Sequence, residues 1–285
     1  MKTVGELLKW AETFALENGK EDSAVKLLLM HVTGKASYEI LADLKMLVPT
    51  SQIEKFQESV RDYVNKNIPV QHIMGYETFL GYQFIVSDEV LIPRFETEEL
   101  VAAVLSAYDE VFGQANVKVV DVGTGSGAIG ITLALEEPKM AVTATEISEK
   151  ALLVAQQNAA NLNAELTFYQ GDMLEPLINR ALTFDILVSN PPYIPLTEDV
   201  DPAVKDHEPH VALFGGVDGL KFYRQILKEA HLVLHPKNII AFEHAYNHKA
   251  AMAALVKQYF PAARFETLKD INGKDRITII INEGE

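Results

Sequence analysis

The larger part of this 285-residue chain, from residue 95 onward, alternates short apolar runs with helical patterns. The apolar runs are rich in Val and Ile and carry few charges, as is typical of strands buried on both faces of a sheet. Strands that alternate with helices form a mostly parallel sheet covered by helices on both faces. The predicted strands cover residues 117–122, 140–145, 166–169, 184–189, 239–243, 265–268 and 276–281, and the predicted helices cover residues 98–111, 128–135, 148–161, 220–234 and 249–259.

The last strands depart from the parallel pattern. Only a short loop around Asn272-Gly273 joins the final pair, so we expect a hairpin there, with one strand running antiparallel. Residues 235–238, His-Pro-Lys-Asn, separate helix 220–234 from its strand, and Asn238 tolerates the left-handed conformation that a turn uses. The sequence therefore predicts a seven-stranded α/β sheet with a turn at 235–238 and one late antiparallel strand.

The N-terminal part has a different pattern. Apolar residues at positions 4, 7, 8, 11, 14 and 15 fall on one face of a helix, and further helical patterns follow up to residue 67. Residues 68–94 alternate aromatic and β-branched residues around Gly75 and Gly81, which predicts a β-hairpin. We therefore expect a small helical bundle over 1–67, a hairpin connector over 68–94 and an α/β domain over 95–285.

Composition narrows the function classes. The chain has no cysteine, which excludes disulfides, thiolate nucleophiles and cysteine-ligated metal sites. No apolar run approaches the roughly 18 residues of a membrane span, and the first residues lack the apolar core of a signal peptide. A cytoplasmic protein that does not bind membranes is therefore expected. The net charge of −15 lies almost entirely after residue 75, which disfavours direct binding to nucleic-acid phosphates.

A glycine-rich loop follows the first strand of the α/β domain. It reads Gly123-Thr124-Gly125-Ser126-Gly127, directly after Asp121 and Val122. At the carboxyl end of a parallel strand, such a loop lets the backbone approach a ligand closely. A P-loop needs Gly-Lys-Ser/Thr, but no lysine occurs from 119 to 138. The dinucleotide-binding motif Gly-x-Gly-x-x-Gly fits only if it begins at Gly125. Gly123 and Thr124 would then lie between the strand and the motif without a role in it.

Acidic residues end the neighbouring strands. Asp121 disfavours a pyrophosphate and suits a ligand that carries an ammonium or a sulfonium group. Glu146 ends the second strand, where a carboxylate can accept both hydroxyls of a ribose. Asp172 follows the third strand and can accept from an adenine amino group, while Met173 packs on the ring. Together with the glycine loop, these residues predict a site for S-adenosylmethionine.

The fourth strand ends in Asn190-Pro191-Pro192-Tyr193. Proline cannot continue a central strand, and two prolines stiffen the loop. The side-chain carbonyl of Asn190 and the backbone carbonyl of Pro191 can accept the two hydrogens of an NH₂ group on a planar carbon, and Tyr193 can stack on its plane. Such a clamp would hold the nitrogen in line with a methyl donor, and orientation of this kind is worth up to about 7–11 kcal/mol.

The chain resembles the protein-(glutamine-N5) methyltransferases that act on class-1 peptide chain release factors, and the resemblance covers nearly its whole length. The matching stretches are LIPRFETEEL (91–100), DVGTGSGAIG (121–130), SNPPYIP (189–195), EPHVALFGGVDGL (208–220) and DINGKDRITII (270–280). The first and the fourth stretch are the specific ones, because Asn-Pro-Pro-Tyr also occurs in amino-methyltransferases that act on nucleic-acid bases.

The resemblance implies a class I S-adenosylmethionine-dependent methyltransferase, Rossmann-like, with S-adenosylhomocysteine as its product. The substrate would be the glutamine of a Gly-Gly-Gln loop, and the helical domain would help dock the release factor. Asn190 would contact both cofactor and substrate, and a pair formed by Arg94 and Glu208 would shape the site wall. A monomer is expected. Phe95 stands where the family usually has proline, and the residues at 235–238 replace a glycine pair.

Other interpretations stay open from the sequence. An adenine amino-methyltransferase would use the same clamp but needs base flipping and a basic groove, which the overall acidity disfavours. A non-catalytic module with a degenerate methyltransferase fold is disfavoured by the intact motifs, and a nicotinamide dehydrogenase fits least well. His207, His210, His244 and His248 are not expected to bind a metal, because the chemistry needs none.

Overall fold

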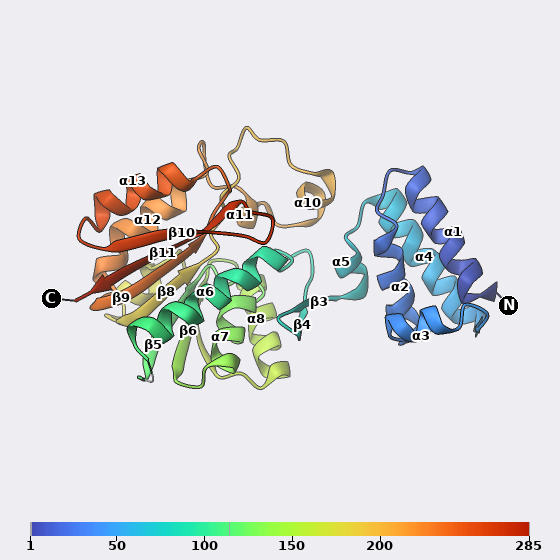
Figure 1. Cartoon of the computed structure of the whole chain (residues 1–285), viewed down its shortest axis with the longest axis horizontal. Coiled ribbons are helices and arrows are strands. Elements are labelled where there is room, and N and C mark those ends of the chain that lie inside the picture. The colour runs from blue at the N-terminus through green and yellow to red at the C-terminus, as the bar shows by residue number, and fades with distance from the viewer. Residues whose placement is uncertain (1, 114, 285) are drawn as a thin grey trace. The chain divides into compact units, whose positions relative to one another are not determined.

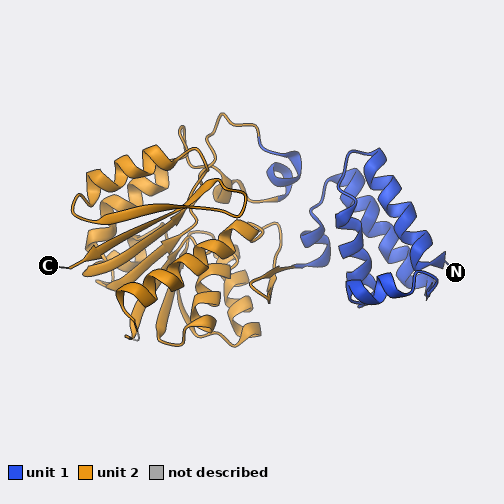
Figure 2. Ribbon diagram, in the orientation of Figure 1, with its two compact units in different colours: residues 1–76, 200–207 blue, residues 77–199, 208–285 orange. Residues whose placement is uncertain are grey.

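The computed structural model describes residues 2–113 and 115–284 (Figure 1). The chain divides into two compact units, one of residues 1–76 and 200–207 and the other of residues 77–199 and 208–285 (Figure 2). The chain therefore leaves the second unit after residue 199 and returns to it at residue 208. The functional boundaries expected at residues 67 and 94 stay a prediction.

The first unit is a helical bundle. Thr3 begins helix α1 with a capping box, because its hydroxyl accepts from the Glu6 N–H (3.2 Å) and the Glu6 carboxylate accepts from the Thr3 N–H (2.7 Å). The core contains buried residues of the four longest helices, such as Leu7, Leu28 and Phe56. The elements are β1 (Lys2–Thr3), α1 (Val4–Glu17), α2 (Ser23–Thr33), α3 (Ser37–Ala42), β2 (Leu47–Val48), α4 (Thr50–Lys66) and α5 (Val70–Met74).

The first unit also contains a short helix from much later in the chain. Helix α10 (Pro202–His207) belongs to it (Figure 2). A ring nitrogen of His207 lies 2.9 Å from the backbone oxygen of Lys66. The last carbonyls of a helix have no partner within the helix, so this histidine can satisfy one at the end of α4. The sequence patterns did not predict this connection.

A β-hairpin follows the bundle within the predicted range of residues 68–94, but residues 70–74 of that range form helix α5 instead of a strand. Strands β3 (Tyr76–Phe79) and β4 (Tyr82–Ile85) form a two-stranded sheet. Leu80 and Gly81 both have positive φ, which is the conformation of a two-residue type I′ turn. No helix in the described ranges is long and apolar enough to cross a membrane.

The second unit has the predicted seven-stranded sheet, in the order β10-β11-β9-β8-β5-β6-β7. All neighbours pair in parallel except β11, which is antiparallel to both β9 and β10 and confirms the predicted late antiparallel strand. The strands are β5 (Val117–Val122), β6 (Met140–Glu146), β7 (Leu166–Gln170), β8 (Phe184–Ser189), β9 (Leu234–Glu243), β10 (Arg264–Lys269) and β11 (Asp275–Glu283).

Helices cover both faces of this sheet (Figure 1). Side chains alternate along β5, so Val119 packs in the core under α6, α7 and α8 while Val120 packs in the core under α9, α12 and α13. Fully buried strands of this kind explain the near-continuous apolar runs of the sequence. The helices are α6 (Phe95–Val111), α7 (Ala128–Glu136), α8 (Glu149–Leu162), α9 (Glu175–Ile178), α11 (His210–Leu213), α12 (Lys221–Glu229) and α13 (Lys249–Tyr259).

Two sequence predictions in this region are wrong. Helix α12 ends at Glu229, not at residue 234, and a 3₁₀ turn (Ala230–Leu232) precedes β9. The residues predicted as a turn, 235–238, extend strand β9, and Asn238 pairs with Asn282 of β11. A register irregularity toward β8 accommodates the proline in this stretch. Pairing with the late β11 strand, which local sequence does not reveal, keeps these residues extended.

Gly127 provides a test of the close packing where the glycine loop enters α7. Its φ is +86°, and a Cβ there would lie 2.6 Å from Ile131 Cδ1 and 3.3 Å from Ala155 Cβ. Gly113 also has a positive φ, but a Cβ there would meet nothing within 4 Å. We expect Gly127→Ala to lower the free energy of unfolding by about 2–4 kcal/mol and Gly113→Ala by about 1 kcal/mol. Urea denaturation measures both, and equal losses would contradict the packing argument.

Candidate active site

A cavity of about 250 Å³ lies where parallel strands of the second unit end. Residues that follow β5, β6, β7 and β8 line it, together with residues from the segments 89–97 and 209–212. Strand order reverses between β5 and β8, because the chain proceeds from β5 to β6 on one side and returns to β8 on the other. Open α/β sheets bind ligands at such a switch point.

The glycine loop forms one wall of the cavity. The N–H groups of Gly123 and Thr124 both donate to the backbone oxygen of Thr145, at 2.9 and 3.0 Å. Gly123, Gly125 and Gly127 have φ values of +72°, +56° and +86°, a region that favours glycine. A Cβ at either of the first two would meet nothing within 4 Å, so the loop presents bare backbone.

Glu146 ends β6 at the edge of this loop and lines the cavity. Its Oε2 accepts from the Gly125 N–H and its Oε1 from the Ser148 N–H, both at 2.9 Å. These two bonds fix the carboxylate while leaving each oxygen further lone pairs. The carboxylate can therefore still accept from two neighbouring hydroxyls of a ligand.

Asp121 lies behind the loop and does not line the cavity. The carboxylate is fully buried, and its Oδ2 accepts from the Thr124 hydroxyl (2.5 Å) and the Gly130 N–H (3.0 Å). Burial raises the pKa of Asp121 to about 6, although these two donors act in the opposite direction. This geometry is that of a loop support. The direct contact with a cationic ligand that we expected from the sequence stays a prediction.

Asp172 and Met173 line the cavity after β7. The Gln225 side chain on α12 donates from Nε2 to Asp172 Oδ2 at 3.1 Å. One oxygen of this carboxylate is thus held by the protein. Met173 is buried and has a positive φ of 44°, which is unusual for a residue with a side chain. The positive φ marks a sharp change of chain direction at the cavity wall.

The Asn190-Pro191-Pro192-Tyr193 turn follows the end of β8. Asn190 and Pro192 line the cavity, whereas Pro191 and Tyr193 are not among its lining residues, so their expected contacts with a substrate amide stay a prediction. The Ser189 hydroxyl donates to the Val122 backbone oxygen at 2.6 Å, which ties the end of β8 to the start of the glycine loop. Burial raises the pKa of Tyr193, so its phenol stays neutral.

The segment after residue 208 packs against this turn and forms backbone hydrogen bonds next to it. Ile194 forms a parallel bridge with Phe214, and its backbone groups bond to Leu213 and Gly215. A Cβ at Gly215 would lie 2.5 Å from the Pro192 oxygen, and one at Gly219 would lie 2.2 Å from the Tyr193 oxygen. Only glycine allows so close an approach of the two backbones, which gives the Phe-Gly-Gly-Val-Asp-Gly stretch a physical reason.

The predicted pairing of Arg94 with Glu208 is confirmed. The Arg94 guanidinium donates to Glu208 Oε1, and Glu208 Oε2 accepts from the Ile92 N–H at 3.1 Å. Glu208 is buried, so its charge is paired rather than solvated. Arg94 lines the cavity, whereas Glu208 holds it from behind. Their expected role toward a substrate stays a prediction.

Several polar residues at the site were missed by sequence reasoning. Asn158 on α8 is fully buried and bonds to both backbone groups of Ile85 in β4 and to the Ser126 oxygen, so it ties the hairpin to the glycine loop. No sequence pattern reveals an asparagine on a buried helix face. The sequence does contain a pattern that points to Glu243. This glutamate is the last residue of β9, just as Glu146 is the last residue of β6.

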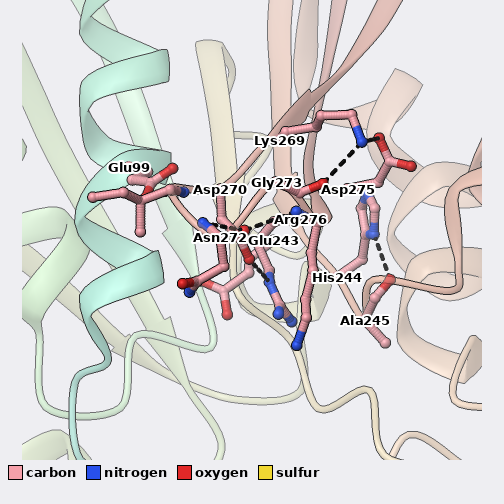
Figure 3. Close-up of polar contacts among 12 residues, drawn as sticks. Glu99, Glu243, His244, Ala245, Lys269, Asp270, Asn272, Gly273, Asp275 and Arg276 are labelled. Atoms are coloured by element: carbon pink, nitrogen blue, oxygen red, sulfur yellow. Dashed lines mark hydrogen bonds and ion pairs between the residues drawn. The ribbon is translucent and has the colours of Figure 1, made fainter.

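Among the histidines considered as metal ligands, His244 has both ring nitrogens engaged by other groups. His244 lies with Nδ1 2.9 Å from the Ala245 oxygen and Nε2 2.9 Å from the Thr278 hydroxyl (Figure 3 shows the first of these). Within the described ranges, no group of three or more His, Cys, Asp or Glu could hold a metal ion. His244 is thus a buried structural side chain beside the site.

Comparison with known proteins gives the family. Residues 100–205 match the Methyltransferase small domain, and residues 6–75 match the PrmC N-terminal domain. The hMettl16 catalytic domain in complex with MAT2A 3'UTR hairpin 1 has a similar fold, with a TM-score of 0.57 at 12% identity over 90% of this chain and 88% of that one. The T. thermophilus 16S rRNA N2 G1207 methyltransferase, solved with AdoMet and guanosine, has a TM-score of 0.51 at 19% identity, over 73% and 49% of the two chains.

These structural similarities confirm the predicted class I methyltransferase fold. The sequence similarity is more specific. The release factor glutamine methyltransferase of Bacillus subtilis strain 168 is 46% identical over 97% of this chain and 96% of its own length. The chain is an enzyme that belongs to the release factor glutamine methyltransferase family.

Proposed function

We propose that the protein transfers a methyl group from S-adenosylmethionine to the side-chain amide nitrogen of the glutamine in the Gly-Gly-Gln motif of class-1 peptide chain release factors. S-adenosylhomocysteine is the second product. One observation carries the proposal: the glycine loop after β5 and the Asn-Pro-Pro-Tyr turn after β8 border the same cavity. The names of the relatives support the glutamine of a release factor as the target.

The cavity residues fit this methyl donor. Glu146 keeps lone pairs for the ribose hydroxyls, and the bare backbone of Gly123 to Gly127 lets the donor approach closely. Asp172 and Met173 would hold the adenine. Three carboxylates in the lining, those of Glu89, Glu146 and Asp172, suit a cationic donor and disfavour a pyrophosphate. The related fold solved with AdoMet supports the same assignment.

The turn after β8 would bind and orient the glutamine amide. Asn190 Oδ1 and the Pro191 oxygen accept its two N–H groups, and Tyr193 packs against the plane of the amide. When bound, S-adenosylmethionine supplies an electrophilic methyl group on a positively charged sulfur. With the amide so held, its nitrogen would take the methyl group as the bond from that carbon to sulfur breaks, and the proton displaced from nitrogen would pass to solvent water. The two acceptors favour this step because they draw the amide hydrogens as positive charge develops on nitrogen.

Among the described residues, those that line the cavity include none from the first unit. We propose that residues 1–67 dock the release factor, that residues 68–94 connect the two parts and that residues 95–285 carry out transfer. The proposed partners are translation factors of the cytoplasm. No helix among the described residues is long and apolar enough to cross a membrane, which agrees with this proposal. Nucleic acid is not the proposed substrate, because the net charge of −15 opposes binding to phosphates.

Asn190→Ala tests the clamp. We expect it to abolish transfer to the release factor, because one of the two amide acceptors is lost, while the affinity for S-adenosylmethionine changes less than about tenfold, or roughly 1.4 kcal/mol. Calorimetry measures binding, and methyl incorporation measures transfer. Asn116→Ala, an exposed residue just before β5, is the matched control and should leave both unchanged. Normal turnover by the Asn190 variant would rule out the clamp.

A competition assay tests the substrate class. Purified release factor and an adenine-containing RNA or DNA oligonucleotide are offered together with methyl-labelled S-adenosylmethionine. We expect label only in the release factor, with a rate that depends little on salt, because counterion release from nucleic acid makes no contribution. Label in the oligonucleotide, lost steeply as salt rises, would instead assign the clamp to the amino group of a base.

A further inference from the structure

A buried chain of hydrogen bonds runs from the clamp to the end of β9. The Asn190 side chain donates from Nδ2 to the Thr97 hydroxyl at 3.3 Å, and that hydroxyl donates to Glu243 Oε2 at 2.7 Å. Thr97 and Glu243 are buried, and Asn190 lies at the cavity wall. We call this chain of hydrogen bonds from Asn190 through Thr97 to Glu243 the relay. It links three separate elements, which are the loop after β8, α6 and β9.

The direction of this relay follows from counting hydrogens. A hydroxyl has one hydrogen, and the Thr97 hydroxyl gives it to Glu243, so its oxygen can only accept. The amide of Asn190 must then turn its NH₂ toward Thr97. Its carbonyl oxygen Oδ1 is consequently on the other side of the amide carbon. The proposed function requires that oxygen as the acceptor for the substrate amide.

We propose that Glu243 is a positioning residue which acts through the Thr97 hydroxyl to hold the Asn190 side-chain amide with Oδ1 turned toward the substrate. The inference rests on the proposed function and deepens it. It also gives a role to a carboxylate at a buried position, since Glu243 is not among the residues that line the cavity. A buried charge is costly unless neighbouring groups stabilise it.

The groups around Glu243 decide its ionisation. Burial raises its pKa to about 7, while Thr97, the positive charge of Arg276 and the Asn190 amide favour the carboxylate and Glu96 opposes it. Arg276 is held by Asp270, whose Oδ2 accepts from Nε at 3.2 Å beside Glu243 (Figure 3). Two phenols, those of Tyr193 and Tyr223, also face Glu243, and Tyr223 donates to its backbone oxygen at 2.7 Å.

Protonation of Glu243 would reverse the relay. A carboxylic acid can donate its own hydrogen to the Thr97 oxygen, which frees the Thr97 hydrogen to point at Asn190. The amide would then turn Oδ1 toward Thr97 and NH₂ toward the substrate, where it would repel the substrate's own N–H groups. The competent form therefore has Glu243 ionised, and transfer should rise with pH through about 7.

Kinetics of the full chain with release factor and S-adenosylmethionine test the relay between pH 5.5 and 8.5. We expect the wild-type kcat to fall about tenfold per pH unit below about 7. Glu243→Gln and Thr97→Val should each lower kcat at pH 8 by at least about tenfold, change KM by less than about twofold, and abolish this pH dependence. Thr97→Ser keeps a hydroxyl and should rescue both rate and pH profile. Glu266→Gln, an exposed carboxylate of β10, is the control.

A second measurement does not depend on activity. The side-chain NH₂ resonances of Asn190, assigned by their loss in Asn190→Ala, should shift with a midpoint near pH 7 in the wild type and stay constant in Glu243→Gln. Wild-type kinetics and resonances retained in Glu243→Gln and Thr97→Val would overturn the inference. If the resonances titrate as expected but the wild type methylates no glutamine, the relay stands and the proposed function fails.

Discussion

The site depends on the parallel pairing of β5 with β8. Their registers place Asp121 opposite Val188, so the glycine loop and the Asn-Pro-Pro-Tyr turn begin at the same level of the sheet. The hydrogen bond from Ser189 to Val122 fixes the two strand ends together. After β5 the chain continues to β6 on one side of the sheet, whereas β8 is followed by β9 on the other side. The two loops therefore border one cavity instead of covering each other. A methyl donor on one loop and an amide on the other would consequently be neighbours.

Two buried carboxylates keep these loops in shape. Asp121 bonds to Thr124 and Gly130 beneath the glycine loop, and Glu243 bonds to Thr97 beneath the clamp. Burial raises the pKa of both groups, to about 6 and about 7. Burying charge in this way is unfavourable in itself. The fold offsets that cost with directed donors, which hold the glycine loop and the Asn190 side chain in defined orientations.

The sequence predicted what depends on local pattern. The seven strands, the antiparallel β11 and the glycine loop all follow from apolar periodicity and glycine placement, and the pairing of Arg94 with Glu208 was expected from the resemblance. It did not predict what depends on distant contacts. Residues 235–238 are extended because they pair with β11, and Asn158 holds the hairpin through partners more than 30 residues away. Likewise, the short helix at 202–207 is part of the N-terminal unit.

The central claim is that the clamp holds a glutamine amide of a release factor. The most direct measurement is the intact mass of a purified class-1 release factor after reaction with this protein and S-adenosylmethionine, beside a factor whose Gly-Gly-Gln motif is changed to Gly-Gly-Ala. We predict the addition of one methyl group to the first factor and none to the second. An unchanged mass for the glutamine-containing factor, or equal methylation of both factors, would contradict the account.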